Sequence, residues 1–223
     1  MSITLHDIGI KSYMISSNAV TKCLVTEREQ IMNEFQGDFE TTDATKYVHK
    51  LSSIFDKPLC RWLIYESETF ANNNGGWTTS RHRNYPTTDL PVKEIRNINK
   101  CLINIVISKI FPLIEEYLHF NKFHLNIKDL FIVKYEHEKQ NCLGFHRDGG
   151  IISFNILLNS PDEFEGGGTT LIINDTNKTF LLDQGDMLLH IGVIKHSGNK
   201  ITKGIRYILV GFIGFMVDYN YKK

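Results

Sequence analysis

The hydrophobic and polar positions of this 223-residue chain follow two different periods. Up to about residue 120 the apolar residues recur mainly at helical spacing, and from about residue 129 they alternate with polar ones. Spacings of three and four place apolar side chains on one face of a helix, whereas a spacing of two places them on one face of a strand. We therefore expect a single domain, in which a helical N-terminal region (1–120) packs on a β-rich core (121–218).

Two helices are predicted in the first half of the chain. The stretch 41–56 starts with Thr and Asp and continues with apolar residues at helical spacing, which is typical of a capped helix. Residues 92–120 predict a long amphipathic helix, which Pro112 kinks or restarts. Its apolar face comprises Ile95, Ile98, Leu102, Val106 and Ile110.

Between these helices, the stretch 72–91 (NNNGGWTTSRHRNYPTTDLP) is rich in residues that break regular structure. A structureless loop of this length is usually functional, so we expect a lid that faces the substrate. Its candidate contact residues are Trp77, Arg81, His82, Arg83 and Tyr85. The alternative is a loop packed against the barrel, with Asp89 and Pro91 capping the next helix.

Short β-branched runs separated by turns fill the second half. The predicted strands lie in DLFIVKYE, IISFNILLN, TTLIIN, KTFLL, DMLLHIG and IRYILVGFIGF, and the loops NSPDEFEGGG, NDTN and DQGD lie between some of them. Short strands at such spacing predict an antiparallel sandwich or barrel. The fold class expected from the pattern is mainly β with N-terminal helices.

Charge and composition limit the kinds of partner that the protein is expected to bind. Lys and Arg together number 25, as do Asp and Glu, so the formal net charge is zero and nucleic acid is disfavoured as a partner. The sequence has no apolar run long enough to span a membrane and no signal-peptide pattern at its N-terminus. The cysteines Cys23, Cys60, Cys101 and Cys142 are widely spaced, which is typical of reduced thiols. We expect an intracellular, cytoplasmic protein, of undetermined oligomeric state, that makes no membrane contact.

The segment GFHRDGG (144–150) contains the pair His146 and Asp148. Residues two apart on a strand point to the same face, so the pair can present an imidazole and a carboxylate to one metal ion. His196 is the candidate for the third ligand, which would complete the facial triad of non-heme Fe(II) oxygenases. His-x-Asp alone is a weak signal, because a histidine in such a segment is more often a hydrogen-bonded loop histidine than a metal ligand. His190, in an apolar strand, is expected in the pocket wall.

Arg206 strengthens the metal-site hypothesis. It shares a strand face with Ile208, Val210 and Phe212, and an arginine buried on an apolar face needs an anionic partner. Its planar fork suits a carboxylate. The alternative is that Arg206 begins an edge strand and points to solvent.

With these residues in view, the motifs KYEHEKQNCLGFHRDGG, SFNILLN, FEGGGTT, GDMLLHIG and KHSGNKITKGIRYILVGF resemble the Fe(II)- and 2-oxoglutarate-dependent dioxygenases. The similarity covers roughly residues 75–215 and is greatest to the catalytic domain of procollagen lysyl hydroxylases, then to prolyl 4-hydroxylases. It implies a double-stranded β-helix, or jelly roll. It also implies Fe(II), 2-oxoglutarate and O₂ as cofactor and co-substrates, with ascorbate as an optional reductant.

The resemblance implies roles for individual residues. His146, Asp148 and His196 would bind iron, and Arg206 would bind the distal carboxylate of 2-oxoglutarate. The residues expected to assist at the co-substrate are Tyr135, Asn155 and Thr169.

Departures from the family leave the substrate open. Thr169 and Thr170 stand where lysyl hydroxylases have Cys-Arg, and the glycosyltransferase region of those enzymes is not in this sequence. Three functions stay open: hydroxylation of a lysyl or prolyl side chain of a protein or peptide, the same chemistry on a nucleobase or small molecule, and non-enzymatic metal binding by a jelly roll.

Overall fold

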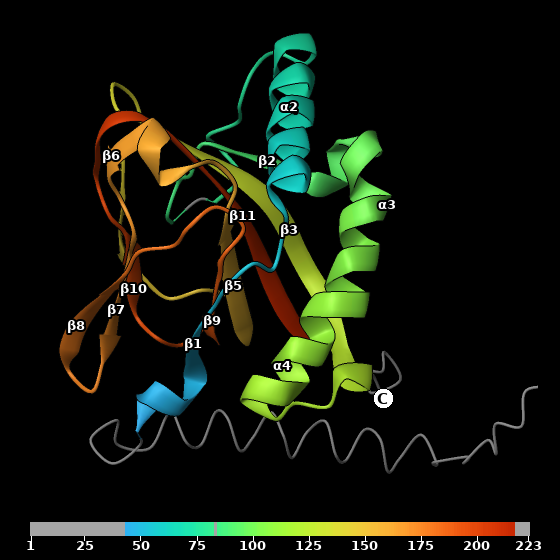
Figure 1. Cartoon of the computed structure of the whole chain (residues 1–223), viewed down its shortest axis with the longest axis vertical. Coiled ribbons are helices and arrows are strands. Elements are labelled where there is room, and N and C mark those ends of the chain that lie inside the picture. The colour runs from blue at the N-terminus through green and yellow to red at the C-terminus, as the bar shows by residue number, and fades with distance from the viewer. Residues whose placement is uncertain (1–42, 83, 217–223) are drawn as a thin grey trace, which may run out of the picture.

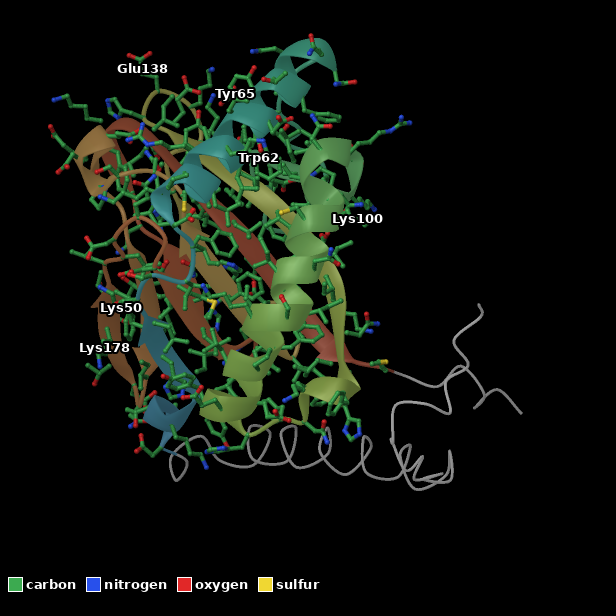
Figure 2. All side chains as sticks on the ribbon, turned by 45° about the vertical axis from the view of Figure 1, so that its right-hand side comes forward. Lys50, Trp62, Tyr65, Lys100, Glu138 and Lys178 are labelled. Carbon is green, nitrogen blue, oxygen red and sulfur yellow. The ribbon has the colours of Figure 1, made fainter. Side chains whose placement is uncertain are left out.

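The computed structural model describes residues 43–82 and 84–216. Within these residues, two antiparallel β-sheets face each other, and the helices cover the other face of the larger sheet (Figure 1). Side chains fill the space between the helices and that sheet, while lysines such as Lys50, Lys100 and Lys178 lie on the outside (Figure 2).

The helices begin at capped or proline-containing turns. Asp56 precedes the first long helix, and its carboxylate accepts a hydrogen bond from the N–H of Leu59. The helical elements are the 3-10 helix Ala44–Tyr47, α2 (Lys57–Asn73), the 3-10 helix Val92–Glu94, α3 (Arg96–Ile105), the π-helical turn Val106–Ile110, α4 (Phe111–Leu118), and the 3-10 helices Lys122–His124 and Pro161–Glu163.

The larger sheet has the strand order β1-β9-β5-β11-β3-β2, and the smaller sheet has the order β4-β10-β7-β8. Strand β6 pairs with the first part of β11. The strands are β1 (Val48–Leu51), β2 (Asp89–Pro91), β3 (Leu125–Glu136), β4 (Leu143–His146), β5 (Ile152–Leu157), β6 (Phe164–Gly166), β7 (Thr169–Ile173), β8 (Thr176–Phe180), β9 (Met187–Ile191), β10 (His196–Gly198) and β11 (Ile201–Phe215). The predicted fold class, mainly β with N-terminal helices, is confirmed.

The amphipathic helix predicted for 92–120 is present, with an interruption. Its apolar stripe is buried against the sheet, from Ile95 to Ile110. The π-helical turn Val106–Ile110 directly precedes α4, which carries Pro112 in its first turn. Because proline has no N–H to donate, the helix must change its hydrogen-bonding pattern at this point.

The helix predicted for 41–56 is wrong. Residues 41 and 42 lie outside the described residues, and Val48–Leu51 form β1, which pairs with β9 from Val48–His190 to Leu51–Met187. The unpaired backbone of β9 offers hydrogen bonds that a short helix would leave unused, so sheet pairing overrides the local helical pattern. Strand β2 likewise pairs with β3 at the opposite edge. The N-terminal region therefore supplies strands as well as helices.

In the described part of the chain, none of the helices combines the length and apolar character that crossing a membrane requires. Cys60, Cys101 and Cys142 carry free thiols. Cys23 lies outside the described residues.

Candidate metal centre

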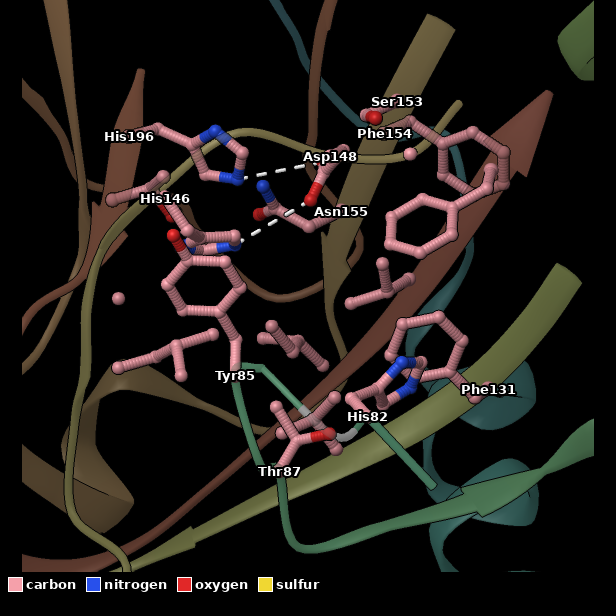
Figure 3. Close-up of a pocket in the computed structure, with 18 of the residues that line it drawn as sticks. His82, Tyr85, Thr87, Phe131, His146, Asp148, Ser153, Phe154, Asn155 and His196 are labelled. Atoms are coloured by element: carbon pink, nitrogen blue, oxygen red, sulfur yellow. Dashed lines mark ion pairs between the residues drawn. The ribbon is translucent and has the colours of Figure 1, made fainter. Parts of the chain in front are cut away.

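Three potential metal ligands meet where β4 and β10 pair. His146 ends β4 and lies opposite His196, the first residue of β10. Asp148 follows two residues after His146 and reaches both rings (Figure 3). Its carboxylate oxygens lie 3.4 Å from Nε2 of His146 and 3.5 Å from Nε2 of His196. One donor atom from each residue lies within 4.8 Å of the other two, which brings the three predicted ligands to a single point.

Backbone carbonyls orient both imidazoles. Nδ1 of His146 lies 2.9 Å from the carbonyl oxygen of Gly144, and Nδ1 of His196 lies 2.9 Å from that of Ile194. A carbonyl oxygen only accepts, so each Nδ1 must carry the proton and donate it. In the uncharged form of each ring, Nε2 keeps a free lone pair on the side of Asp148, which is the arrangement found in histidines that bind metals.

The charges suit a cation. Burial raises the pKa of Asp148, but the hydrogen bond with His146 and the charge of His196 outweigh it and lower the pKa to about 2. Burial, together with the charge of His190, lowers the pKa of His196 to about 4. The pKa of His146 is raised, because its bond to Asp148 outweighs the opposing effect of burial. Near neutral pH the centre therefore offers an ionised carboxylate beside an uncharged His196.

A cavity of about 460 Å³ opens beside this centre and runs between the two sheets. All seven predicted site residues line it, together with apolar side chains of β11 such as Ile208 and Val210. The seven are Tyr135, His146, Asp148, Asn155, Thr169, His196 and Arg206. His190 also lies in the wall, with its ring centroid 4.7 Å from that of His196.

Arg206 lies in the cavity wall, and no acidic side chain of the described residues pairs with it. Its side chain is buried, and its Nη1 atom has no hydrogen-bond partner among the described residues. Burial lowers the pKa of this guanidinium. The alternative that Arg206 points to solvent is thus excluded. A buried cation that lacks a partner is costly, so this position suits an anionic ligand.

Uncharged polar groups line the same cavity as Arg206. Burial raises the pKa of Tyr135 to about 12, so its hydroxyl stays protonated. The Oδ1 atom of Asn155 is buried and lacks a hydrogen-bond partner in the described structure. Thr169 is buried at the start of β7. Together they offer both donors and an acceptor to a polar ligand.

Sequence reasoning missed Ser153, which is buried beside Asp148 and helps to lower the pKa of that carboxyl. The sequence does contain a signal that points to Ser153. Ser153 precedes Asn155 by two positions in β5, so alternation places both side chains on the same face of the sheet.

The predicted capping role of Asp89 is wrong. Pro91 is the cap of the following 3-10 helix and makes no side-chain bond there, while Asp89 is fully buried within β2. Its carboxylate accepts hydrogen bonds from Arg81, at 2.7 Å, and from the hydroxyl of Thr87. Nε2 of His82 lies 3.2 Å away. A buried carboxylate needs such partners more than a helix terminus needs a cap.

The loop predicted over 72–91 is shorter than expected, because α2 extends to Asn73 and β2 begins at Asp89. His82 and Tyr85 line the cavity, and the ring of Tyr85 lies 5.1 Å from that of His146. Trp77 instead donates to Glu68 and packs near Tyr207, in a second hollow of the surface. Arg83 lies outside the described residues.

No family model matches the chain. Among curated proteins, the rat multifunctional procollagen lysine hydroxylase and glycosyltransferase LH3 is 27% identical over 174 residues, which cover 72% of this chain and 22% of the relative. The chain spans about a fifth of the length of the curated relatives it matches.

Solved structures extend the comparison to the fold. A Pseudomonas putida prolyl-4-hydroxylase superposes with a TM-score of 0.59 at 13% identity, covering 78% of this chain and 96% of that one. SnoN, a non-heme α-ketoglutarate-dependent epimerase from nogalamycin biosynthesis, gives a TM-score of 0.60 at 11% identity, covering 86% and 82%. The fold is therefore the double-stranded β-helix of Fe(II)- and 2-oxoglutarate-dependent oxygenases. The sequence relatives are procollagen lysyl hydroxylases, so the predicted resemblance and the predicted jelly-roll core are both confirmed.

Proposed function

We propose that this chain is an Fe(II)- and 2-oxoglutarate-dependent dioxygenase that hydroxylates an aliphatic C–H bond in a side chain of a protein, on lysine or proline. The observation that carries the proposal is the unpaired guanidinium of Arg206 in the same cavity as the His146, Asp148 and His196 cluster. A protein that only stored metal would have no use for a buried, unpaired cation beside the metal.

The donor set fits Fe(II). Two imidazoles and one carboxylate on one side of a metal are the ligands of non-heme Fe(II) oxygenases, and they leave coordination positions for other ligands. When bound, Fe(II) supplies the O₂-activating chemistry, with 2-oxoglutarate as the co-substrate that is oxidised to succinate and CO₂. His146, Asp148 and His196 hold the ion, and the Gly144 and Ile194 carbonyls keep the two rings in their tautomers.

The part of the cavity around Arg206 fits the co-substrate. The Arg206 fork can donate two hydrogen bonds to the distal carboxylate of 2-oxoglutarate. The Tyr135 hydroxyl can add a third, and Asn155 and Thr169 can contact the rest of the molecule. Ile208 and Val210 wall this part of the cavity and exclude water, which strengthens each polar contact inside it.

A protein substrate is supported by the relatives. The curated proteins that match are procollagen lysine hydroxylases, whose names specify a protein substrate. The relatives thus favour a protein side chain over a nucleobase or a free small molecule.

The test is succinate formation from 2-oxoglutarate with Fe(II), followed by mapping of +16 Da sites on proteins of a cell extract. The wild type should form succinate and His146→Ala should not. His137→Ala is the matched control, because His137 is exposed in a turn away from the cavity and should leave turnover unchanged. Succinate formation that survives His146→Ala would refute the proposal.

A further inference from the structure

The cavity continues along β11 from Arg206 to an aromatic end. Arg206, Ile208, Val210 and Phe212 all line it, and they alternate along one strand. At the Phe212 end, the Phe212 ring lies 5.2 Å from the ring of Phe131, which is in turn 4.8 Å from the His82 ring. We name this end, formed by His82, Phe131 and Phe212, the aromatic compartment. In Figure 3, His82 and Phe131 lie on the opposite side of the view from Tyr85, His146 and His196.

Within the described residues, no carboxylate at the aromatic compartment is free to pair with a cation. Among the described residues that line the whole cavity, Asp148 is the only acidic one, and it belongs to the metal centre. Asp89 and Asp129 lie behind the wall, and Arg81 pairs with both, at 2.7 and 2.6 Å. The side chain of Asp89 is fully buried and has further partners in Thr87 and His82.

The face of an aromatic ring can attract an ammonium group. In this compartment, however, the guanidinium of Arg81 already lies over the Phe131 ring. The guanidinium carbon of Arg81 lies 5.3 Å from the centroid of the Phe131 ring. The rings of His82 and Phe212 pack against the same phenyl group. A second cation entering the compartment would lose its hydration without gaining a free carboxylate, because Asp89 and Asp129 are already bonded to Arg81.

We propose that the aromatic compartment receives an uncharged side chain, an aliphatic chain or a proline ring, and discriminates against protonated lysine. The inference rests on the proposed function and narrows its substrate. A lysine could enter after losing its proton, but with a reference pKa of about 10.4 the uncharged form at pH 7.4 is about one molecule in a thousand. The expected discrimination therefore lies between about tenfold and about a thousandfold.

The test compares peptide pools with randomised flanks and one fixed central residue: norleucine, proline or lysine. Norleucine and lysine share the same four-carbon chain, so the pair isolates the ammonium group. The protein loaded with Mn(II) and 2-oxoglutarate is incubated with an equal mixture of the pools. Peptides that co-elute with it are counted by mass spectrometry. Norleucine or proline peptides should be enriched at least about tenfold over lysine peptides.

A matched pair of variants tests the electrostatic cause. Asn84 lines the cavity at its exposed rim, so Asn84→Asp adds a carboxylate there with almost no change in shape. This variant should reduce the discrimination against lysine severalfold. Asn126→Asp is the control, because Asn126 is exposed near the start of β3 and does not line the cavity.

Peptide retention and succinate formation together distinguish a failure of this inference from a failure of the proposed function. Equal or greater retention of lysine peptides would overturn the inference, as would retention of none of the pools, whatever the turnover. If norleucine or proline peptides are retained selectively but the Fe(II)-loaded protein forms no succinate, the inference stands and the proposed function fails. Lysine peptides that are retained poorly yet oxidised faster than the others would also overturn the inference.

Discussion

Arg206 and Tyr135 face each other across the antiparallel pair of β11 and β3, and the guanidinium carbon lies 5.5 Å from the centroid of the phenol ring. The ring shields one side of the guanidinium, and the protein leaves Nη1 without a hydrogen-bond partner within the described residues. The pair therefore holds a positive charge in place for a ligand that the chain itself does not supply.

Asp148→Ala should abolish Fe(II) binding and leave the fold intact. The carboxylate is the only anionic ligand of the cluster, and its loss leaves two uncharged donors that hold Fe(II) weakly. Anaerobic titration with Fe(II) measures the affinity, and circular dichroism checks the fold. Asp183→Ala is the control, because Asp183 is exposed. Wild-type affinity in Asp148→Ala would remove this residue from the site.

Metal affinity should fall by about one factor of ten for each pH unit below neutrality, which corresponds to one competing proton. The reason is that the pKa of His146 is raised above its usual value, whereas that of His196 is lowered to about 4. As the pH falls from 7.5 to 5, His146 gains a proton that the metal must displace, while His196 stays uncharged. Titrations at several pH values give the slope. A slope of two protons, or no slope, would contradict this assignment of the histidines.

Asp89→Asn should lower the free energy of unfolding by about 2–3 kcal/mol, the scale of charge-assisted hydrogen bonds to a buried group. Asp129→Asn should cost less than about 1 kcal/mol, because the Asp129 side chain is 26% exposed whereas that of Asp89 is fully buried. Urea denaturation of the two variants compares them directly. Equal losses would mean that Asp89 does not organise the loop.

Tyr85→Ala should slow substrate hydroxylation more than it slows succinate formation without substrate. Tyr85 is 44% exposed at the cavity and its ring lies 5.1 Å from that of His146, so it is placed to touch a substrate rather than the co-substrate. Tyr65→Ala, on the exposed face of α2, is the control. A parallel fall in both rates would make Tyr85 a structural residue of the loop.

The cluster of potential metal ligands could be predicted from sequence because two signals agree. The spacing of His146 and Asp148 is visible in a short window, and the family resemblance over residues 75–215 adds His196 and Arg206. The β1 strand and the role of Asp89 could not be predicted in this way. Val48 pairs with His190, and Arg81 joins Asp89 to Asp129, so both outcomes depend on partners far along the chain. Local propensity carries no information about such pairings.

The most direct test of the central claim is an anaerobic titration of the Fe(II)-loaded protein with 2-oxoglutarate, in wild type, Arg206→Ala and Arg206→Lys. Two charge-assisted hydrogen bonds, each worth roughly 1.5–3 kcal/mol, predict a rise in the dissociation constant of about two orders of magnitude or more for Arg206→Ala. Arg206→Lys should recover part of the affinity, because lysine keeps the charge without the fork. Fe(II) binding should stay unchanged, as should both affinities in the exposed control Arg61→Ala. An unaltered affinity for 2-oxoglutarate in Arg206→Ala would contradict the account.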